Sequence, residues 1–571
     1  MSVFFLRRIL TLLATLVAAS LIIFLVLDAL PGNAAQMLMG ADASPDAVRA
    51  LTVKLGLDQP LTIRYLLWLK GMAVGDLGNS YVYGTPVAGL IAERLVLTIP
   101  LAIMSMLITV VLALAAGIYT AANHNKLGDV GVMSLTQIGI ALPNFWFAIL
   151  LILLFSVKLQ LLSAGGFAGW DDGIWPGIRS LLLPSISLAV VQAAILARVT
   201  RSAVLEVLRE DFVRTAGAAF AHILRGEGET RIAVGHDMRP SSPALAAAFA
   251  EGAASQGLNV IDLGLTSTDE LYFVAGSENC AGAMFTASHN PAQYNGIKLC
   301  RAGATPVSTD TGLGEIARMI LEGVPGYEGE AGVVDKHDSL DEYASYLREL
   351  VPVPTRRKLV VAVDAANGMA GMTVPAVLGD MDIRPLYFEL DGTFPNHEAN
   401  PLDPKNLVDL QKFTVEQGAD IGLAFDGDAD RCFVVDERGE AVSPSAITAL
   451  IATRTLEQHP GATIIHNLIT SRAVPELIAE NGGKAVRTRV GHSFIKAQMA
   501  EHQAAFGGEH SAHYYFQEFW NADSGMLAAM HVLAALGQSD KPLSELMAEY
   551  SRYEASGEIN STVEDQKAAT Q

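Results

Sequence analysis

Three aspartates at alternate positions carry the strongest chemical signal in the sequence. Asp426, Asp428 and Asp430 follow the apolar run IGLAF, and Arg431 comes directly after them. Carboxylates on a tight loop are ligands that a hard cation such as Mg²⁺ prefers, and an adjacent arginine can neutralise phosphate. A calcium-binding EF-hand is one alternative, but its sixth loop position, which needs glycine, is Arg431 here. A solvated acidic turn is the other alternative.

A serine beside a histidine forms the second candidate group. Ser288 lies in the hexapeptide TASHNP, where His289 follows it and Pro291 ends the loop, and Lys298 comes shortly after. Such a serine can act as a nucleophile or as a phosphate carrier. Most Ser-His pairs are turn residues that make local hydrogen bonds, and Lys298 can equally be a plain surface charge. The hexapeptide alone does not decide between these interpretations.

Two later loops combine polar groups that bind sugars and phosphates. The segment GGEHSAH contains Glu509, Ser511 and His513, a set suited to gripping sugar hydroxyls. The segment RVGHSFIK contains Arg489 and His492, which can meet a phosphate or a leaving oxygen. Each loop by itself is also compatible with an ordinary surface loop, because His, Lys and Arg are common there.

Short apolar runs alternate with alanine-rich segments around these loops. Strands are expected over 231–237, 258–264, 358–368, 421–428, 432–437 and 462–468, and helices over 242–257, 312–322, 340–351 and 406–418. This alternation predicts layered α/β domains. The Pro-rich stretch VPVPTRR at 351–357 predicts a boundary between two of them.

The first 216 residues differ in composition from the rest of the 571-residue chain. They contain 14 Lys and Arg against 12 Asp and Glu, whereas residues 217–571 contain 25 against 48. The acidic second part argues against a nucleic-acid-binding surface, which needs clustered Lys and Arg. Four apolar runs predict membrane spans at about 9–30, 95–122, 130–157 and 180–200. A cleaved signal peptide is the alternative for the first run, but its apolar region is too long.

The positive charges indicate how these spans are oriented. Arg7 and Arg8 precede the first span, Lys126 follows the second, and Arg198 and Arg201 lie at the end of the fourth. Four crossings place these charges on one side, which the positive-inside rule identifies as the cytoplasm. We therefore expect a multi-pass protein of the inner (plasma) membrane, in contact with membrane lipid, whose residues after Arg198 are cytoplasmic.

Residues 1–216 resemble the dipeptide/oligopeptide/nickel permease family of ATP-binding-cassette importers. The resemblance rests on four blocks in order: LDALPGNAA, LGLDQPLTIRYLLWLKGMAVGDLGNSY, IGIALPNFWFAILLILLF and ARVTRSAVLEVLREDFVRTA. In that family the last block opens a cytoplasmic helix that docks on the ATPase, which implies a second permease and an ATPase as partners. Here the block ends at Ala216 and no later run is long enough to span a membrane, which argues against transport.

The four reactive loops, in their order along the chain, resemble the phosphohexomutase family, specifically its phosphomannomutase/phosphoglucomutase branch. TASHNP matches the phosphoserine loop of that family, DGDADR its magnesium loop and GEHSAHYYF its sugar-recognition loop. VGHDMRPSS matches an earlier segment beside the phosphate, which assigns Arg239 to substrate binding. The resemblance covers about residues 217–563.

The two resemblances together imply a fusion of an α-helical transmembrane bundle of four spans (1–216) with three α/β domains. The mutase domains are expected at 217–352 without the first strand, 353–456 with the metal loop and 457–555 with the sugar loop, and 556–571 is a remnant of a fourth. The fourth domain of the family holds the substrate phosphate with an Arg-x-Ser-Asn-Thr loop, of which 559–563 is a poor likeness. We therefore expect impaired mutase turnover, since positioning dominates phosphoryl transfer.

The mutase resemblance implies roles for the residues named above. Phosphorylated Ser288 would exchange its phosphoryl group with a glucose or mannose 1- or 6-phosphate through a 1,6-bisphosphate. Mg²⁺ would be held by Ser288, Asp426, Asp428 and Asp430. The catalytic set is Ser288, His289, Lys298, Arg431 and His492, and the substrate-binding set is Arg239, Arg489, Glu509, Ser511 and His513.

Other interpretations of the whole chain stay open. The chain can be a permease subunit with an incidental soluble tail, or a mutase tethered to the membrane to serve glycan synthesis at the inner leaflet. A recombined or misassembled reading frame explains both the early end of the permease block at Ala216 and the missing first mutase strand. The join at 215–217 also has no Gly/Ser or Pro linker.

Overall fold

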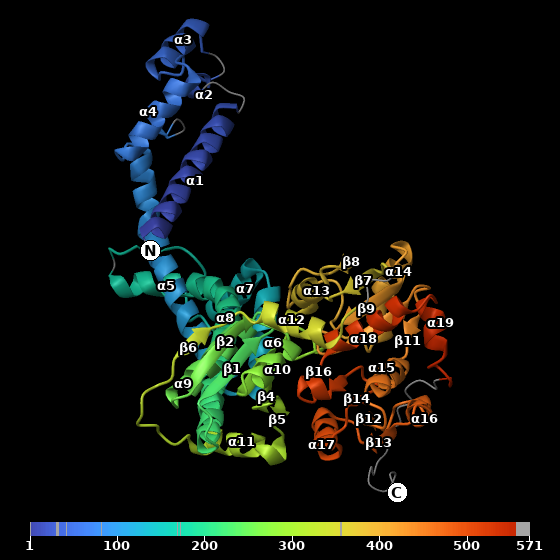
Figure 1. The fold of residues 1–571 in the computed structure, drawn as a ribbon. Helices are drawn as coiled ribbons and strands as arrows, with labels where there is room; N and C mark the ends of the chain where they lie inside the picture. Colours follow the sequence, from blue (N-terminus) through green and yellow to red (C-terminus); the bar gives the residue numbers. More distant parts are fainter. Residues whose placement is uncertain are drawn as a thin grey trace. The chain divides into compact units, whose positions relative to one another are not determined.

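The chain forms two compact units, Met1–Leu205 and Glu206–Gln571. The structure is a computed structural model (Figure 1). It describes residues 2–29, 34–40, 43–80, 83–167, 169–171, 173–353 and 357–554. The expected remnant of a fourth mutase domain at 556–571 lies outside the described residues.

The first unit is helical. Its helices are α1 (Ser2–Ala29), α2 (Ala34–Met39), α3 (Pro45–Lys54), α4 (Leu61–Ala73), α5 (Val87–Ala122), α6 (Leu127–Ala141), α7 (Asn144–Leu151), a π-helical stretch (Ile152–Lys158) and the start of α8 (Ile174–Gly226). In the described part of the chain, three helices are long and apolar enough to cross a membrane: α1, α5 and α8. The pair α6 and α7 with its π-helical stretch makes a fourth span if it is counted as one, so the expected bundle is confirmed in outline.

The expected span over 130–157 contains a sharp bend in the structure. The helical pair Leu127–Ala141 and Asn144–Lys158 is bent by 104°. Leu142, at the break, has an extended backbone with ψ 126°, and Pro143 follows it. Proline cannot donate a backbone hydrogen bond and disfavours helical conformation in the preceding residue, so a helix ends there.

Small residues let the helices of the first unit approach closely. Ala113 in α5 and Ala189 in α8 are fully buried. A Cβ atom added at Gly117 would lie 2.6 Å from the Cβ of Thr200, so α5 and α8 meet there only because Gly117 has no side chain. Such small-residue contacts are typical of helices packed in membranes.

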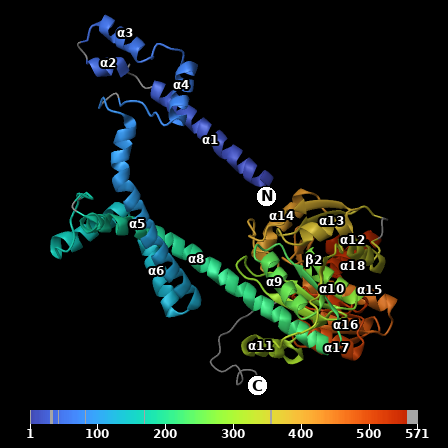
Figure 2. The same ribbon diagram turned by 90° about the vertical axis from the view of Figure 1, so that its left-hand side faces the viewer.

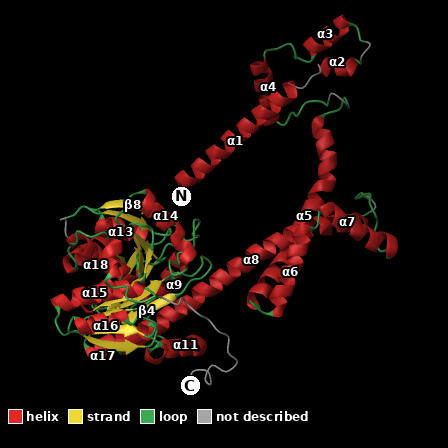
Figure 3. Cartoon of the chain, turned by 90° about the vertical axis from the view of Figure 1, so that its right-hand side faces the viewer, coloured by secondary structure: helices red, strands yellow, loops and turns green. Residues whose placement is uncertain are grey.

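The second unit contains three sheets with helices packed against them (Figures 1 and 3). The first sheet has the order β5-β4-β3-β1-β2-β6, the second β11-β10-β9-β7-β8 and the third β13-β12-β14-β15-β16. The strands of the first sheet are β1 (Arg231–His236), β2 (Asn259–Leu265), β3 (Ala281–Phe285), β4 (Ile297–Arg301), β5 (Thr305–Pro306) and β6 (Val334–Lys336). Those of the second are β7 (Val360–Asp364), β8 (Asp382–Leu386), β9 (Ile421–Phe425), β10 (Cys432–Asp436) and β11 (Ala441–Val442). Those of the third are β12 (Thr463–Asn467), β13 (Lys484–Thr488), β14 (Phe506–Gly508), β15 (Tyr514–Phe516) and β16 (Ala522–Asp523).

The helices of the second unit connect and cover these strands. They are α9 (Ser242–Ser255), α10 (Thr268–Ser277), α11 (Leu313–Glu322), α12 (Leu340–Leu350), α13 (Ala370–Leu378), α14 (Val408–Glu416), α15 (Pro444–Gln458), α16 (Ala473–Glu480), α17 (His492–His502), α18 (Gly525–Gln538) and α19 (Leu543–Ala548). All six predicted strands and all four predicted helices are present, and the fourth helix begins as a 3₁₀ turn over Pro404–Leu407. The strand β10 after the three aspartates is incompatible with the exit helix of an EF-hand.

The C-terminal part of α8 belongs to the second unit (Figure 2). Phe220 and Leu224 are fully buried and pack in one core with Phe249 and Phe285. A Cβ atom added at Gly217 would lie 2.2 Å from the carbonyl oxygen of Phe249, so α8 and α9 cross in close contact at this glycine. The boundary between the units therefore falls earlier than residue 216, where the sequence pattern placed it.

Candidate active site

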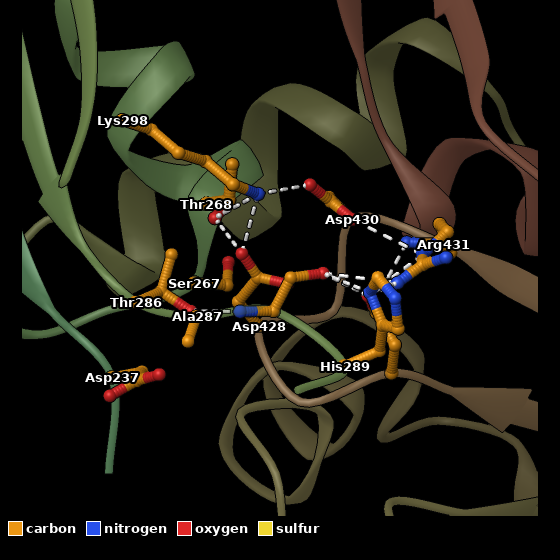
Figure 4. Close-up of polar contacts among 12 residues, drawn as sticks. Asp237, Ser267, Thr268, Thr286, Ala287, His289, Lys298, Asp428, Asp430 and Arg431 are labelled. Atoms are coloured by element: carbon orange, nitrogen blue, oxygen red, sulfur yellow. Dashed lines mark hydrogen bonds and ion pairs between the residues drawn. The ribbon is translucent and has the colours of Figure 1, made fainter. Parts of the chain in front are cut away.

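The predicted reactive loops leave the carboxyl ends of parallel strands. β3 pairs in parallel with β1, β9 with β7, and β14 with β12. The Ser288 loop follows β3, the three aspartates follow β9, and Glu509 follows β14. Carboxyl ends of parallel strands are the usual edge for ligand binding in α/β sheets. Figure 4 shows the side chains that meet where the first two loops converge.

Ser288 is held in a strained position against the aspartate loop. Its backbone is left-handed, with φ 51°, and its N–H donates to Thr286 Oγ1 at 2.9 Å. The Ser288 hydroxyl donates to Asp426 Oδ2 at 2.8 Å and accepts from Arg431 Nη2 at 3.1 Å. A non-glycine residue keeps such a backbone only when its surroundings fix it, which is typical of functional loops.

The structure uses the Arg239 guanidinium within the fold, whereas the sequence analysis expected it to bind substrate. Its side chain is fully buried, and its Nε donates to Asp237 Oδ2 at 3.0 Å. Its four remaining N–H groups donate to the backbone carbonyls of Pro291, Tyr294, Ser288 and Asn290. All five donors are used, so Arg239 positions the Ser288 loop.

The three aspartates form a buried oxygen cluster. Asp426, Asp428 and Asp430 are fully buried, and one carboxylate oxygen of each lies within 4.8 Å of the others. The left-handed backbone of Ala429, with φ 63°, turns the loop tightly. Asp428 Oδ1 and Asp430 Oδ1 have no hydrogen-bond partner among the described residues. Buried carboxylates need a cation, and oxygen ligands of this kind fit Mg²⁺.

Two cationic side chains surround the cluster. Lys298 Nζ lies 2.6 Å from Asp428 Oδ2 and 2.6 Å from Asp430 Oδ2 (Figure 4). Arg431 Nε donates to Asp426 Oδ2 at 2.9 Å. Burial opposes the charge of Lys298, but these two carboxylates outweigh it and raise the pKa of Lys298. Lys298 is therefore suited to donate hydrogen bonds while it stays protonated.

The aspartates themselves titrate differently because their neighbours differ. Burial raises the pKa of Asp426 although Arg431 opposes this. Burial acts on Asp430 in the same sense, but Lys298 and His513 outweigh it and hold the pKa of Asp430 well below its ordinary value. The loop thus combines one carboxyl group that accepts a proton readily with another that stays ionised.

His289 is neutral at physiological pH. Burial and the positive charge of Arg431 lower the pKa of His289 to about 4. Arg431 Nη2 contacts His289 Nδ1, and since arginine has only donors, Nδ1 is the acceptor and Nε2 carries the proton. The ring lies beside Ser288, whose Oγ is 3.4 Å from Nδ1.

The sugar loop reaches the aspartate loop through His513. His513 Nε2 lies 3.6 Å from Asp430 Oδ1, and its Nδ1 lies 3.5 Å from Glu509 Oε2 and 3.3 Å from the Ser511 hydroxyl. Burial opposes the charge of His513, but the two carboxylates raise its pKa to about 9. In return, His513 and Tyr515 outweigh burial and lower the pKa of Glu509 to about 2. The predicted sugar-binding residues are thus brought together with the predicted metal ligands.

The segment RVGHSFIK is placed less directly at the site. Arg489 is exposed, and its guanidinium lies 3.6 Å from the centre of the Phe494 ring. The His492 side chain lies outside the described side chains. The segment is linked to the sugar loop by Gly491, whose N–H donates to Glu509 Oε1 at 3.2 Å. No contact of Arg489 with the Ser288 loop occurs among the described residues.

The sequence analysis missed Thr268, and it missed Asp523 as the partner of Lys496. The Thr268 hydroxyl donates to Asp428 Oδ2 at 2.5 Å, and Lys496 Nζ lies 3.0 Å from Asp523 Oδ1. Thr268 lies 160 positions before its partner, so no local pattern signals it. Lys496 lies in the segment RVGHSFIK, whose cations the sequence pattern proposed as contacts for phosphate, but Asp523 lies 27 positions later and no local pattern signals it.

Family models match both units. The phosphoglucomutase/phosphomannomutase alpha/beta/alpha domains I, II and III match residues 198–323, 341–439 and 443–553. The model of the binding-protein-dependent transport system inner membrane component matches residues 113–250, and the model of its N-terminal part matches residues 1–102. Both kinds of model cover the C-terminal part of α8, and the match of the mutase domain I model from residue 198 agrees with its place in the second core.

Individual relatives point to the same family. A phosphomannomutase from Salmonella montevideo is 37% identical over 375 residues, which cover 64% of this chain and 82% of the relative. Phosphohexose mutases from Xanthomonas campestris pv. campestris are 38% identical over 375 residues, covering 65% and 83%. The crystal structure of a phosphoglucomutase/phosphomannomutase family protein from Burkholderia thailandensis has a TM-score of 0.56 at 31% identity, covering 59% of this chain and 75% of that one. Through residues 198–553, joined to a permease-like first unit, the chain belongs to the phosphoglucomutase/phosphomannomutase family.

Proposed function

We propose that the second unit is a phosphohexomutase that interconverts hexose 1-phosphates and 6-phosphates, with glucose and mannose phosphates as the candidate substrates. The observation that carries the proposal is the position of the Ser288 hydroxyl. Its oxygen contacts Asp426 of the metal loop at 2.8 Å and Arg431 at 3.1 Å. A serine between a carboxylate cluster and an arginine is placed to carry a phosphoryl group.

The transfer exchanges one P–O bond for another. A hydroxyl oxygen of the hexose phosphate attacks the phosphorus on Ser288, the bond from phosphorus to Ser288 Oγ breaks, and Oγ regains a proton. The proton that leaves the attacking sugar hydroxyl balances the proton that Oγ gains, and in the unphosphorylated chain the Oγ proton is donated to Asp426 Oδ2. The bisphosphorylated sugar then turns over and returns its other phosphoryl group to Oγ, releasing the isomeric monophosphate.

The cofactor proposed for this site is Mg²⁺, held by Ser288, Asp426, Asp428 and Asp430. When bound, it stabilises the negative charge that develops on the transferred phosphoryl group. Arg431 donates toward the same oxygen of Ser288 and adds a second positive contact. Lys298, which stays protonated beside Asp428 and Asp430, donates hydrogen bonds to phosphate or sugar oxygens that approach the loop.

The sugar is proposed to bind at Glu509, Ser511 and His513. This set is supported by its link to the metal loop, since His513 bridges Glu509 and Asp430. Arg489 and His492 remain proposed contacts for the second phosphate on the basis of the sequence pattern. Arg239 contributes indirectly, by holding the carbonyl groups of the Ser288 loop.

The chain is membrane-associated, and we propose that it lies in the inner membrane with the mutase unit on the cytoplasmic side. Clustered arginines in α8, among them Arg198 and Arg201, support this orientation by the positive-inside rule. Protease added to intact spheroplasts should leave the mutase unit uncut, and cleavage without lysis would refute the orientation.

A second candidate activity, as a permease subunit of an ATP-binding-cassette importer with further subunits as partners, is favoured by the family models over 1–102 and 113–250.

Isotope exchange tests the mutase proposal. The full chain in detergent is incubated with Mg²⁺, labelled glucose 1,6-bisphosphate and unlabelled glucose 6-phosphate. We expect label to move into the monophosphate pool, because Ser288 takes it from one sugar and passes it to the next. Ser288→Ala should abolish exchange, whereas Ser277→Ala is the matched control, since the Ser277 hydroxyl donates to Phe273 O inside α10. Exchange at the parent rate in Ser288→Ala would refute the proposal.

A further inference from the structure

The first turn of α10 holds the metal loop through one residue, Thr268. Its backbone N–H donates to the carbonyl oxygen of Asp428 at 3.1 Å, and its hydroxyl donates to Asp428 Oδ2 at 2.5 Å. Thr268 is fully buried and points toward the aspartate loop (Figure 4). A single residue of α10 therefore fixes both the backbone and the carboxylate of a proposed metal ligand.

These contacts give the two oxygens of the Asp428 carboxylate different partners. Oδ2 accepts from the Thr268 hydroxyl and from Lys298 Nζ at 2.6 Å. Oδ1 is buried and has no hydrogen-bond partner in the part of the chain that the structure describes. Because a carboxylate is rigid and planar, fixing Oδ2 also fixes the direction of Oδ1. Oδ1 is thus the oxygen that is left for a cation.

The Thr268 hydroxyl also orients the lysine beside it. Lys298 Nζ lies 3.4 Å from Thr268 Oγ1, and it bridges Asp428 Oδ2 and Asp430 Oδ2. The hydroxyl proton is donated to Asp428, so the lone pairs of Oγ1 face the ammonium group. Thr268 and Lys298 together occupy one oxygen of each carboxylate. Neither Oδ1 has a hydrogen bond among the described residues, but Asp430 Oδ1 lies 3.6 Å from His513 Nε2, whereas Asp428 Oδ1 has no such ion pair there.

The turn that carries Thr268 is itself fixed by its neighbour. The buried carboxylate of Asp269 accepts from the hydroxyls of Ser267 at 2.5 Å, Tyr343 at 2.7 Å and Ser524 at 2.7 Å. Ser524 caps α18, and Tyr343 lies in α12. Thr268 therefore cannot shift without breaking a buried network that joins three helices.

We propose that Thr268 is a positioning residue for the metal site, whose hydroxyl turns the Asp428 carboxylate so that Oδ1 faces the cation. The inference rests on the proposed Mg²⁺ site and adds a residue outside it. Removing a group that orients a metal ligand typically weakens metal affinity about 10- to 100-fold. Because the loss lies in affinity, excess Mg²⁺ should restore isotope exchange.

Calorimetric titration of the full chain in detergent with Mg²⁺ alone tests the inference. We expect Thr268→Val to bind Mg²⁺ about tenfold more weakly, and Thr268→Ser, which keeps the hydroxyl, to stay within about twofold of the parent. Thr414→Val is the matched control, because Thr414 is equally buried and donates to Leu410 O in its own helix. The Mg²⁺ concentration that half-saturates isotope exchange should rise by the same factor in Thr268→Val.

The variant Asp428→Asn separates this inference from the proposed function. If Asp428→Asn loses Mg²⁺ affinity and Thr268→Val binds as tightly as the parent, the inference is wrong and the metal site stands. If Asp428→Asn also binds as tightly as the parent, the metal site is wrong, and the inference falls with it. A tenfold loss in Thr268→Ser would overturn the inference too. Thr268→Ala, which removes the same hydroxyl without adding bulk, replaces Thr268→Val if the latter does not fold.

Discussion

The two units of this chain use apolar side chains in opposite ways. In α5 of the first unit, Val111 is 66% exposed, and buried positions are taken by small residues such as Ala113. In α18 of the second unit, Val532 and Leu533 are fully buried. Large apolar side chains on the outside are typical of a protein in lipid, whereas the same residue types are buried in a protein that is surrounded by water. The overall hydrophobic content of 51% therefore has two causes: side chains that face lipid in the first unit and side chains that pack in the core of the second.

Two sites of buried charge, one in each unit, also differ in how far the fold satisfies them. In the first unit, the buried Asp129 accepts from Arg201 through both carboxylate oxygens. In the second, Asp428 keeps its Oδ1 without a hydrogen bond among the described residues, although the side chain is fully buried. The comparison teaches that a buried charge with a structural role is satisfied within the fold. A buried charge with a functional role is left incomplete for a ligand.

Helix α8 offers the sharpest way to break this comparison, because both environments occur along it. Phe220→Ala should destabilise the second unit by about 3–5 kcal/mol, since Phe220 is fully buried in its core. Phe212→Ala is the control on the same helix, and it should cost less than about 0.5 kcal/mol because Phe212 is 55% exposed. Hydrogen exchange in β1 measures both effects.

Equal losses of stability in Phe220→Ala and Phe212→Ala would contradict the placement of the C-terminal part of α8 in the second core. A related expectation is that a soluble fragment must begin near Glu206, because one that begins after Gly226 lacks Phe220 and Leu224.

Arg239 tests whether a satisfied buried charge can be replaced by another cation. Arg239→Lys should destabilise the second unit by about 2–3 kcal/mol, because lysine cannot reproduce five N–H bonds in fixed directions. The rate of isotope exchange should fall at least about tenfold, because the Ser288 loop loses its anchor. A tenfold fall corresponds to a loss of about 1.4 kcal/mol of transition-state stabilisation. Mg²⁺ affinity should change much less, which calorimetry can show. An isotope-exchange rate in Arg239→Lys equal to that of the parent would mean that the Ser288 loop needs no such anchor.

His397 gives a smaller, pH-dependent effect. Its Nε2 lies 2.9 Å from Asp364 Oδ2 and its Nδ1 lies 2.9 Å from the carbonyl oxygen of Glu398, so both neighbours are acceptors. Burial alone would lower the pKa of His397, but Asp364 outweighs it and raises the pKa above its ordinary value. The stabilisation is therefore complete below about pH 6.5, the pKa of an unfolded histidine, and is lost as the pH rises through the folded pKa.

His397→Gln should remove this dependence, at a cost of about 1.5 kcal/mol below pH 6.5 and less at alkaline pH. Thermal unfolding of parent and variant at several pH values measures the difference. His459→Gln is a suitable control, because His459 is exposed and lies 3.7 Å from Glu518. A pH-independent difference between His397→Gln and the parent would contradict the assigned ion pair.

The sequence predicted those parts of the site that are local in the chain. Asp426, Asp428 and Asp430, which were grouped by their alternate spacing, form a buried oxygen cluster in the structure. The strands before and after them lie where the apolar runs indicated. Side chains four residues apart, such as Glu509 and His513, were also grouped correctly. These features depend on backbone periodicity, which a single sequence records.

The features that escaped prediction depend on distant partners. The type of Arg239 does not tell whether its guanidinium meets a phosphate or the carbonyls of a loop some 50 residues later. Thr268 resembles any other threonine until Asp428 is placed beside it. The bend at Pro143 had a visible signal, since proline ends helices, but the absence of charged residues over 130–157 favoured a single span.

The most direct test of the account is to locate the phosphate. The full chain is incubated with glucose 1,6-bisphosphate and Mg²⁺, quenched, digested and examined by mass spectrometry. The account predicts phosphate on the peptide that contains Ser288, no phosphate in Ser288→Ala, and a strongly reduced level in Asp428→Asn, because the metal site would be weakened. Phosphate on a different residue, or full phosphorylation of the Ser288 peptide in Asp428→Asn, would contradict it.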